Sequence, residues 1–202
     1  LAQRGELVLH ASAIQLTDGT GVAFLGNTGW GKSTIASSYF ANGADLITDD
    51  CLMIKIDKNT AFGISNYSGL RLYQDSTDAI FASCEPFQSV AHYSTKKRLI
   101  LHGNEETALP VPINSMFLLN DPQKHTFDSV TIEKVQGADG LMAVIEQVFL
   151  LDVTDKNIVQ KQFRNASALF GAIPAVFKLG YPRDHGLLGE VRARIEKVLI
   201  DS

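Results

Sequence analysis

The sequence predicts an α/β fold in a single domain that spans residues 1–202. Three observations point to it. Short apolar runs typical of strands fill much of the first half, and apolar residues at helical spacing dominate the last third. The strand-like run GVAFLG (21–26) leads directly into a glycine-rich segment and then into a helical pattern. With 202 residues, 45% apolar and 20% charged, the chain can bury a substantial core and has the composition of a globular protein.

The first half of the chain is predicted to consist mainly of strands. TDGTG separates two apolar runs and is typical of a hairpin turn. From Ser33 to Ala41 the apolar residues fall at helical spacing, and Asn42-Gly43 predicts the end of that helix. The segment 59–114 mixes short apolar runs with glycines and charges and gives no secure pattern. The expected strands are 6–16, 21–26, 44–50, 51–57 and 115–120.

Three helices and one strand are predicted in the last third. A strand is expected in PAVFKLGYP (174–182), which ends at its last proline. The cluster Arg183–His185 that follows is predicted to cap the last helix. The apolar faces of the helices are formed by Leu141, Ile145 and Val148; by Val159, Phe163, Ala166 and Phe170; and by Leu188, Val191, Ile195 and Val198.

Composition excludes several classes of protein. Lysine and arginine number 18 against 22 acidic residues, and this net charge of −4 argues against a nucleic-acid partner. Cys51 and Cys84 have neither metal-type spacing nor the density of a disulfide framework, so a reducing, cytoplasmic location is predicted. No apolar stretch approaches the roughly 20 residues of a membrane span, so no membrane partner is expected.

The segment after the predicted strand 21–26 matches the phosphate-binding pattern G-x-x-x-x-G-K-[ST]. Its glycines let successive backbone N–H groups point into one concavity, and the following helix adds its positive end. Lys32 would reach the β- and γ-phosphates of ATP, and the Ser33 hydroxyl would bind Mg²⁺. Trp30 is bulky for its position and either packs against a neighbouring loop or covers a base or substrate. The predicted nucleotide-binding residues are Gly26, Asn27, Thr28, Gly29, Trp30, Gly31, Lys32, Ser33 and Thr34.

Two adjacent carboxylates, Asp49 and Asp50, follow a predicted strand that could lie next to the strand leading into the loop. Ligands of α/β sheets bind at the carboxyl ends of strands, which would place both carboxylates near the γ-phosphate. Because adjacent residues of a strand point to opposite sides, the two carboxylates need different roles. One would hold Mg²⁺ and the other would accept the proton of the incoming nucleophile. The alternative is that Asp-Asp only ends a strand in a turn.

Three segments together resemble the catalytic domain of the HPr kinase/phosphorylase family. They are LHASA (9–13), GNTGWGKST (26–34) and ADLITDDCLMI (44–54), in the family's order and with its spacing from Lys32 to Asp49. The resemblance implies a domain with the phosphate loop, a mixed sheet and flanking helices, related to the phosphoenolpyruvate carboxykinases. Two later segments, YSGLRLYQDSTDAIF (67–81) and HYSTKKRL (92–99), are similar to stand-alone members that phosphorylate the C-terminal serine of lasso-type precursor peptides.

The resemblance also implies roles for individual residues. Lys32 and Ser33 take the phosphate and Mg²⁺ roles, and Asp49 matches the proton acceptor. Asp50 matches the second aspartate, with a metal-binding or structural role, and His10 matches a histidine near the carboxylates. Family members carry glutamate where this chain has Thr34. The family's later metal-binding glutamate and its arginine for phosphate removal have no clear match, so reversible action on HPr is not expected.

A basic cluster supplies further candidates for binding a substrate or phosphate. Lys96, Lys97 and Arg98 either form a solvated strand end or stabilise the transferring phosphoryl group or a peptide carboxylate. Arg71 lies inside an apolar strand-like run, where an arginine usually faces an ion pair or an anion.

Two functions from different classes follow. The first is an ATP-dependent serine kinase with a small peptide or protein partner. The second is a nucleotide-binding switch or accessory module that phosphorylates no hydroxyl. The second carboxylate favours the kinase, since a switch gains little from it. The family resemblance also makes a homo-oligomer an option.

Overall fold

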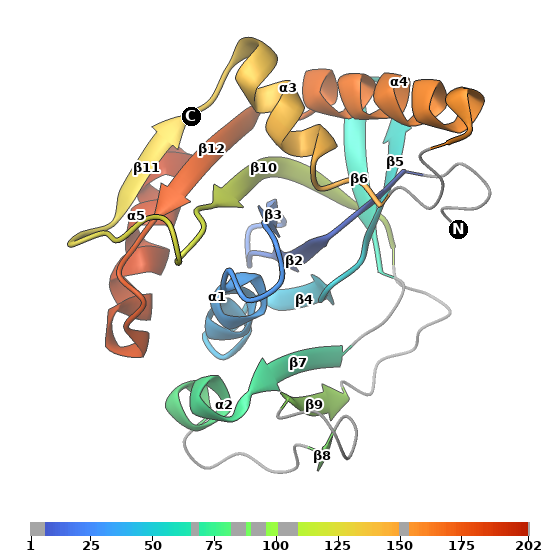
Figure 1. Ribbon diagram of the computed structural model, residues 1–202. Helices are drawn as coiled ribbons and strands as arrows, with labels where there is room; N and C mark the ends of the chain where they lie inside the picture. Colours follow the sequence, from blue (N-terminus) through green and yellow to red (C-terminus); the bar gives the residue numbers. More distant parts are fainter. Residues whose placement is uncertain are drawn as a thin grey trace.

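A computed structural model describes residues 7–65, 69–81, 109–149 and 154–201, and the strands 88–89 and 96–100 as backbone. The chain forms a mixed sheet with helices on both faces, as the sequence predicts for an α/β fold (Figure 1). No helix in these ranges is long and apolar enough to cross a membrane.

The central sheet has the strand order β1-β5-β6-β10-β3-β2-β4, with β12 paired to β10 and β11 paired to β12. The predicted hairpin is confirmed, because β2 and β3 pair antiparallel across the TDGTG turn. The strand in PAVFKLGYP is β12, which lies parallel to β10. The strands are β1 (Leu7–Leu9), β2 (Ala11–Gln15), β3 (Gly21–Leu25), β4 (Asp45–Thr48), β5 (Leu52–Asp57), β6 (Thr60–Ile64), β10 (Val111–Leu119), β11 (Thr131–Lys134) and β12 (Ala175–Gly180).

The strand order brings several chain segments to one edge of the sheet. Strands β3, β10 and β12 are parallel, so all three end at the same edge. Strand β4 is not the neighbour of β3, which corrects the expected arrangement, because β2 lies between them. Since β2 is antiparallel to both, β4 still ends at the edge where β3 ends, and β2 begins there. His10 and Asp49 therefore lie at the same edge as the glycine-rich segment.

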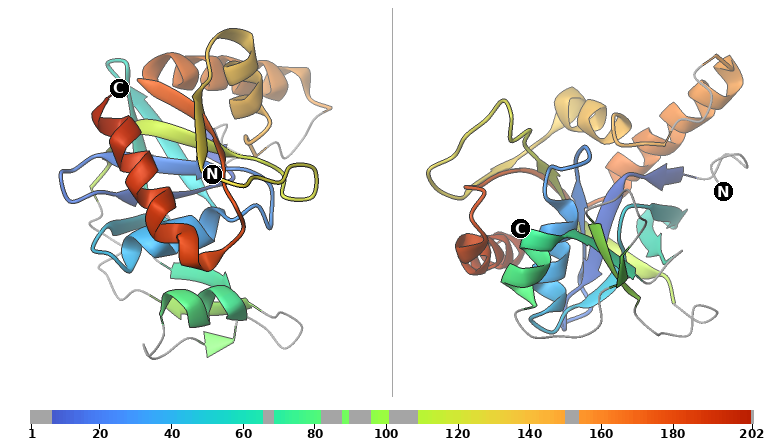
Figure 2. Two further views of the ribbon diagram at one scale, coloured as in Figure 1. Left: turned by 90° about the vertical axis from the view of Figure 1, so that its left-hand side faces the viewer. Right: turned by 60° about the horizontal axis from the view of Figure 1, so that its bottom comes forward.

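Two helical layers cover the sheet. Helices α1 (Lys32–Phe40) and α5 (Leu188–Ile200) pack on one face, and α3 (Gly137–Ile145) and α4 (Lys156–Ala172) on the other. Figure 2 shows α5 lying across one face of the central sheet, with α3 and α4 away from it. Alternate side chains of β10 enter opposite cores, with Met116 on the α3/α4 side and Phe117 on the α1/α5 side.

The predicted apolar faces of these helices are confirmed in part. On α5, Leu188, Val191 and Ile195 are buried as expected. On α4, Ala166 is buried and Phe170 packs against the core as expected, but Phe163 is 50% exposed. The buried stripe also includes Gln162, Leu169 and Ala172. The polar Gln162 conceals this stripe from a reading based on apolar residues alone. Helix α3 ends at Ile145, and Val148 instead forms a bridge with Leu9.

A second, three-stranded sheet arises from the segment that the sequence left unassigned. Its order is β7-β9-β8, with β7 (Gly69–Tyr73), β8 (Gln88–Ser89) and β9 (Lys96–Ile100). Helix α2 (Gln74–Ile80) follows β7 directly. The small sheet and α2 lie on the α1 side of the molecule (Figure 1), and β7 contacts α1.

Candidate active site

The glycine-rich loop (Gly26–Ser33) connects β3 to α1 in a conformation that depends on glycine. Gly26, Gly29 and Gly31 have φ values of 152°, 83° and 96°, in the range that residues with a Cβ rarely adopt. Gly31 directly precedes α1, and a Cβ there would also overlap the side chains of Arg183 and Tyr181. The loop therefore delivers its backbone N–H groups and the start of α1 to the same place.

Lys32 is held against the beginning of this loop. Its side chain is buried, with only 5% of the residue exposed. Nζ donates to the carbonyl oxygens of Gly26 at 2.7 Å and Asn27 at 3.2 Å, and lies 3.3 Å from Nε2 of His10. The ammonium group is thus fixed at the carboxyl end of β3, beside the loop.

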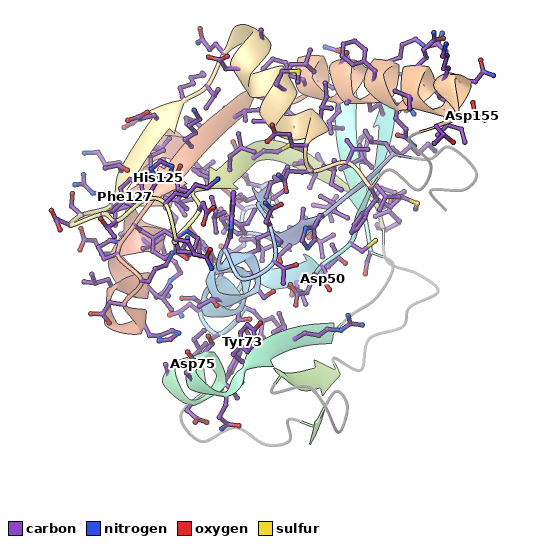
Figure 3. All side chains as sticks on the ribbon, in the orientation of Figure 1. Asp50, Tyr73, Asp75, His125, Phe127 and Asp155 are labelled. Atoms are coloured by element: carbon purple, nitrogen blue, oxygen red, sulfur yellow. The ribbon has the colours of Figure 1, made fainter. Side chains whose placement is uncertain are left out.

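A hollow of about 60 Å³ lies between the loop and the small sheet. Figure 3 shows Asp50 at the end of β4 and Tyr73 on β7, which bound this region from two sides. The lining residues are Thr28, Gly29, Gly31, Lys32, Ser33, Thr34, Asp50, Arg71, Leu72 and Tyr73.

Asp49 is not among the residues that line the hollow, and its contacts lie on other elements around it. It is 5% exposed, and its Oδ1 accepts from the Ser12 hydroxyl at 2.6 Å while Oδ2 accepts from the Arg71 N–H at 2.9 Å. The Ser33 hydroxyl, just after the start of α1, is close enough to lower the pKa of Asp49. Burial raises the pKa of Asp49, and these hydrogen bonds offset part of that rise. Asp49 thereby ties β2, the start of α1 and β7 together.

Asp50 occupies a different environment from Asp49, as predicted, but not through strand alternation, because β4 ends at Thr48 and both aspartates follow it. Its φ of 82° turns the chain, and its side chain is 45% exposed and lines the hollow. Oδ2 lies 3.3 Å from Nη1 of Arg71, and Oδ1 lies 3.4 Å from Nε2 of His10. The ion pair with Arg71 is exposed enough to exchange readily for another partner.

His10 stands between the lysine and the carboxylate. Its Nε2 is close to both Nζ of Lys32 and Oδ1 of Asp50. Nε2 either accepts from Lys32 or donates to Asp50, and the tautomer of the ring decides which of the two contacts is a hydrogen bond. Its ring also packs near Phe149, and its backbone N–H donates to the Gln147 carbonyl.

The remaining predicted residues fall into two groups. Arg71 lines the hollow, and the register pairs β7 with β9 so that Arg71 lies opposite Arg98 and Tyr73 opposite Lys96. The structure thus brings the backbone of Lys96, Lys97 and Arg98 one strand away from the hollow; their side chains lie outside the described part. Trp30 faces elsewhere, packing against the α1/α5 core and lining a separate cavity of about 230 Å³.

Sequence reasoning missed several contacts. Ser12 lies in the segment LHASA (9–13), but its hydrogen bond to Asp49 forms only because β2 pairs with β4, which the sequence alone does not predict. Thr34 lies 3.4 Å from the Ser76 hydroxyl, which in turn lies 3.1 Å from Nε2 of His185. The predicted cap of the last helix is wrong, because α5 begins after Leu187 without a side-chain cap. Asp184 instead caps the short 3-10 helix His185–Leu187, accepting from the Gly186 N–H. Arg183 turns back to the loop instead.

The residues around the hollow fit Mg²⁺ bound together with a polyphosphate. No cluster of three or more histidine, cysteine or carboxylate side chains able to hold a metal ion occurs within the described ranges. Mg²⁺ in phosphate sites needs only one or two protein oxygens, because phosphates and water supply the others. Ser33 and Asp50 line the same hollow and are of the right chemical type.

Comparisons with known proteins leave the family open. No protein-family model and no curated protein matches the sequence. Among solved structures, the chain is similar to the Hpr(Ser) kinase/phosphatase from Coxiella burnetii, with 14% identity and a TM-score of 0.48. The match covers 96% of this chain and 99% of that one. A likeness of this size establishes neither the family nor the activity of this chain, so the family and its substrates stay predictions.

Proposed function

We propose that this chain is a Mg²⁺- and ATP-dependent kinase that phosphorylates a serine hydroxyl of a peptide or small protein. The observation that carries the proposal is the convergence of Lys32, Ser33, Asp50 and Arg71 around one hollow at the start of α1. A lysine, a hydroxyl, a carboxylate and an arginine beside backbone N–H groups are the parts that phosphoryl transfer uses. The C-terminal serine of a lasso-type precursor is the proposed acceptor, on the family resemblance.

The chemistry is an in-line transfer. The serine oxygen forms a bond to the γ-phosphorus while the bond from that phosphorus to the β–γ bridging oxygen breaks, and ADP leaves. Bound Mg²⁺ would neutralise charge on the phosphates, with Ser33 and a carboxylate holding it. Lys32 and the loop N–H groups bind the phosphates, and Arg71 stabilises the charge that develops on the transferring group.

The serine proton passes to one of the two carboxylates. The family resemblance gives this role to Asp49, and the raised pKa of Asp49 makes it a stronger base than an ordinary aspartate. Asp50 would then serve the metal with Ser33. The low exposure of Asp49 supports an exchange of roles, with Asp50 as the acceptor, because Asp50 lines the hollow and Asp49 does not.

Parallel Asp49→Asn and Asp50→Asn variants separate the two assignments. The variant of the proton acceptor should bind Mg·ATP normally and lose transfer by about 100-fold or more. The variant of the metal-side carboxylate should lose Mg²⁺-dependent nucleotide binding. If neither variant changes transfer, the proposed chemistry is wrong.

A nucleotide-binding switch is the rival function. A switch needs the loop and one metal-binding carboxylate, and a second carboxylate beside the γ-phosphate would repel the nucleotide. Asp50 contacts Arg71 and His10, and these partners lower that repulsion, so the formation of phosphopeptide is the observation that separates the two functions.

Intact-mass spectrometry on peptides that end in serine tests the proposal. Each peptide is incubated with the protein, Mg²⁺ and ATP, and a matched peptide ends in alanine. The kinase predicts a gain of one phosphoryl group on the serine peptide, and none on the alanine peptide or with Lys32→Ala. ATP hydrolysis without any modified peptide would support the switch.

A further inference from the structure

Arg183 connects the three parallel strands at the edge where the hollow lies. It follows β12, and its Nη1 donates to the carbonyl oxygen of Trp30 and to the Tyr181 hydroxyl, both at 2.5 Å. Its Nη2 donates to the carbonyl oxygen of Asn120, just after β10, at 3.0 Å. One guanidinium group thus joins the glycine-rich loop after β3 to the ends of β10 and β12.

The surroundings hold this guanidinium group in place. Its central carbon lies 4.3 Å from the centre of the Tyr181 ring, a cation–π distance. Tyr181 is itself buried, and burial raises the pKa of its phenol, which stays neutral. Among the described residues the acceptors of Arg183 are two carbonyl groups and this phenol, all uncharged. The positive charge therefore remains available to polarise the loop.

We propose that Arg183 is a positioning residue of the phosphate site, acting through the peptide bond between Trp30 and Gly31. The C=O and N–H of a trans peptide point in opposite directions. Because Arg183 fixes the Trp30 carbonyl on one side, the Gly31 N–H is directed to the other, where Gly31 lines the hollow. A cation on the carbonyl also strengthens the N–H as a donor.

This inference rests on the proposed function, because it requires that the hollow binds phosphate. It adds a residue outside the loop motif that sets the loop's affinity. Since the Gly31 N–H is part of the phosphate cradle, Arg183 contributes to the binding of ADP and ATP alike. A guanidinium group that touched the γ-phosphate directly would affect ATP only.

The test uses Arg183→Gln and Arg183→Lys, with Arg194→Gln as the control. Arg194 is exposed on α5, so this control removes the same charge away from the loop. Dissociation constants for inorganic tripolyphosphate, ADP and ATP are measured with Mg²⁺ by calorimetry. Two-dimensional ¹H–¹⁵N spectra follow the Gly31 amide, and thermal melting follows stability.

We expect Arg183→Gln to weaken all three ligands by about tenfold and to shift the Gly31 amide proton upfield. Arg183→Lys keeps the positive charge but loses the two-pronged guanidinium geometry. Its dissociation constants and its Gly31 amide shift should therefore lie between those of Arg183→Gln and wild type. Arg194→Gln should match wild type. If Arg183 had only a structural role, its variants would lower the melting temperature. The Gly31 amide shift of Arg183→Lys would then not lie between those of Arg183→Gln and wild type.

Three results would overturn the inference. One is unchanged binding of all ligands by Arg183→Gln, or by Arg183→Lys if Arg183→Gln does not fold, with the Gly31 amide unmoved. Another is weakened binding of ATP alone, which would indicate direct contact with the γ-phosphate. If the wild-type chain binds neither tripolyphosphate nor ATP, the proposed function fails first and this inference with it.

Discussion

At the residue scale, the buried carboxylate of Asp49 is the least ordinary group of the molecule. Water has been removed from it, and hydroxyl and N–H donors from Ser12, Ser33 and Arg71 replace that water. The replacement is incomplete, because the pKa of Asp49 remains raised. A carboxylate kept in this state costs stability, which is typical of a group retained for function.

The donors to Asp49 make the first prediction. Ser12→Ala removes the 2.6 Å hydrogen bond to a buried charge and should lower the free energy of unfolding by about 1–3 kcal/mol at neutral pH. Urea unfolding measures it. Ser37→Ala is the matched control, because that buried hydroxyl donates only to the Ser33 carbonyl within α1. Equal losses in the two variants would show that Asp49 does not depend on Ser12.

The raised pKa makes the second prediction, whose sign follows from linkage. The folded state holds the Asp49 proton more tightly than the unfolded state, where the pKa is about 3.9. The wild type therefore loses stability as the pH rises through the raised pKa, whereas Asp49→Asn lacks this titration. The unfolding free energy of the variant minus that of the wild type should increase as the pH rises above about 4 and through the raised pKa. A flat or falling difference in urea titrations would contradict the raised pKa.

At the element scale, the glycine-rich loop and the start of α1 were predictable, and their partners were not. The loop motif, its strand and its helix are local patterns, so residues 21–41 reveal them directly. The position of β7 depends on a contact between distant parts of the chain. The Arg71 N–H donates to Asp49, which is 22 residues away in sequence. The segment that contains β7 has no clear periodicity, so the sequence indicates only a strand-like run around Arg71 and predicts no partner for it.

The predicted position of β4 next to β3 was wrong. The sequence alone predicts β4, which precedes Asp49, as a neighbour of β3. In the structure β2 lies between β3 and β4. A hairpin strand can add on either side of its partner, and nothing local to 44–50 decides this. The prediction of a shared edge survived because two antiparallel pairings restore the direction of β4.

The loop conformation makes the third prediction. Gly31 and Gly43 have almost the same φ, 96° and 95°, but a Cβ at Gly31 meets Arg183 and Tyr181 while a Cβ at Gly43 meets open space. Gly43→Ala should cost only backbone strain, about 1–2 kcal/mol, and leave nucleotide binding intact. Gly31→Ala should abolish Mg·ATP binding. Comparable binding by both variants in calorimetry would show that the loop does not need its observed conformation.

At the scale of the whole molecule, one sheet separates two apolar cores. Leu169 of α4 is fully buried on one face, and Ile195 of α5 on the other. Both cores share β10, whose side chains alternate between them. Sequence pattern predicted a single α/β domain, and the family resemblance implied the mixed sheet with flanking helices. On α4 the pattern correctly included the buried Ala166, but it also included the exposed Phe163 and omitted the buried polar Gln162.

The shared strand makes the fourth prediction. If the chain is a single cooperative domain, Leu169→Ala and Ile195→Val should both lower the same unfolding transition, by about 2–5 and 0.5–1.5 kcal/mol. Because the two sites lie on opposite faces of the sheet, the double variant should show the sum to within about 0.5 kcal/mol. Two separate transitions in calorimetry would contradict the single domain predicted for residues 1–202.

The most direct measurement of the central claim is the balance of products in one reaction. ADP and phosphopeptide are quantified together over time, with Mg²⁺, ATP and a peptide ending in serine. A kinase predicts one phosphoserine formed for each ADP released, with both products lost in Lys32→Ala. ADP that accumulates with inorganic phosphate and without phosphopeptide would contradict the account and identify a nucleotide-hydrolysing switch.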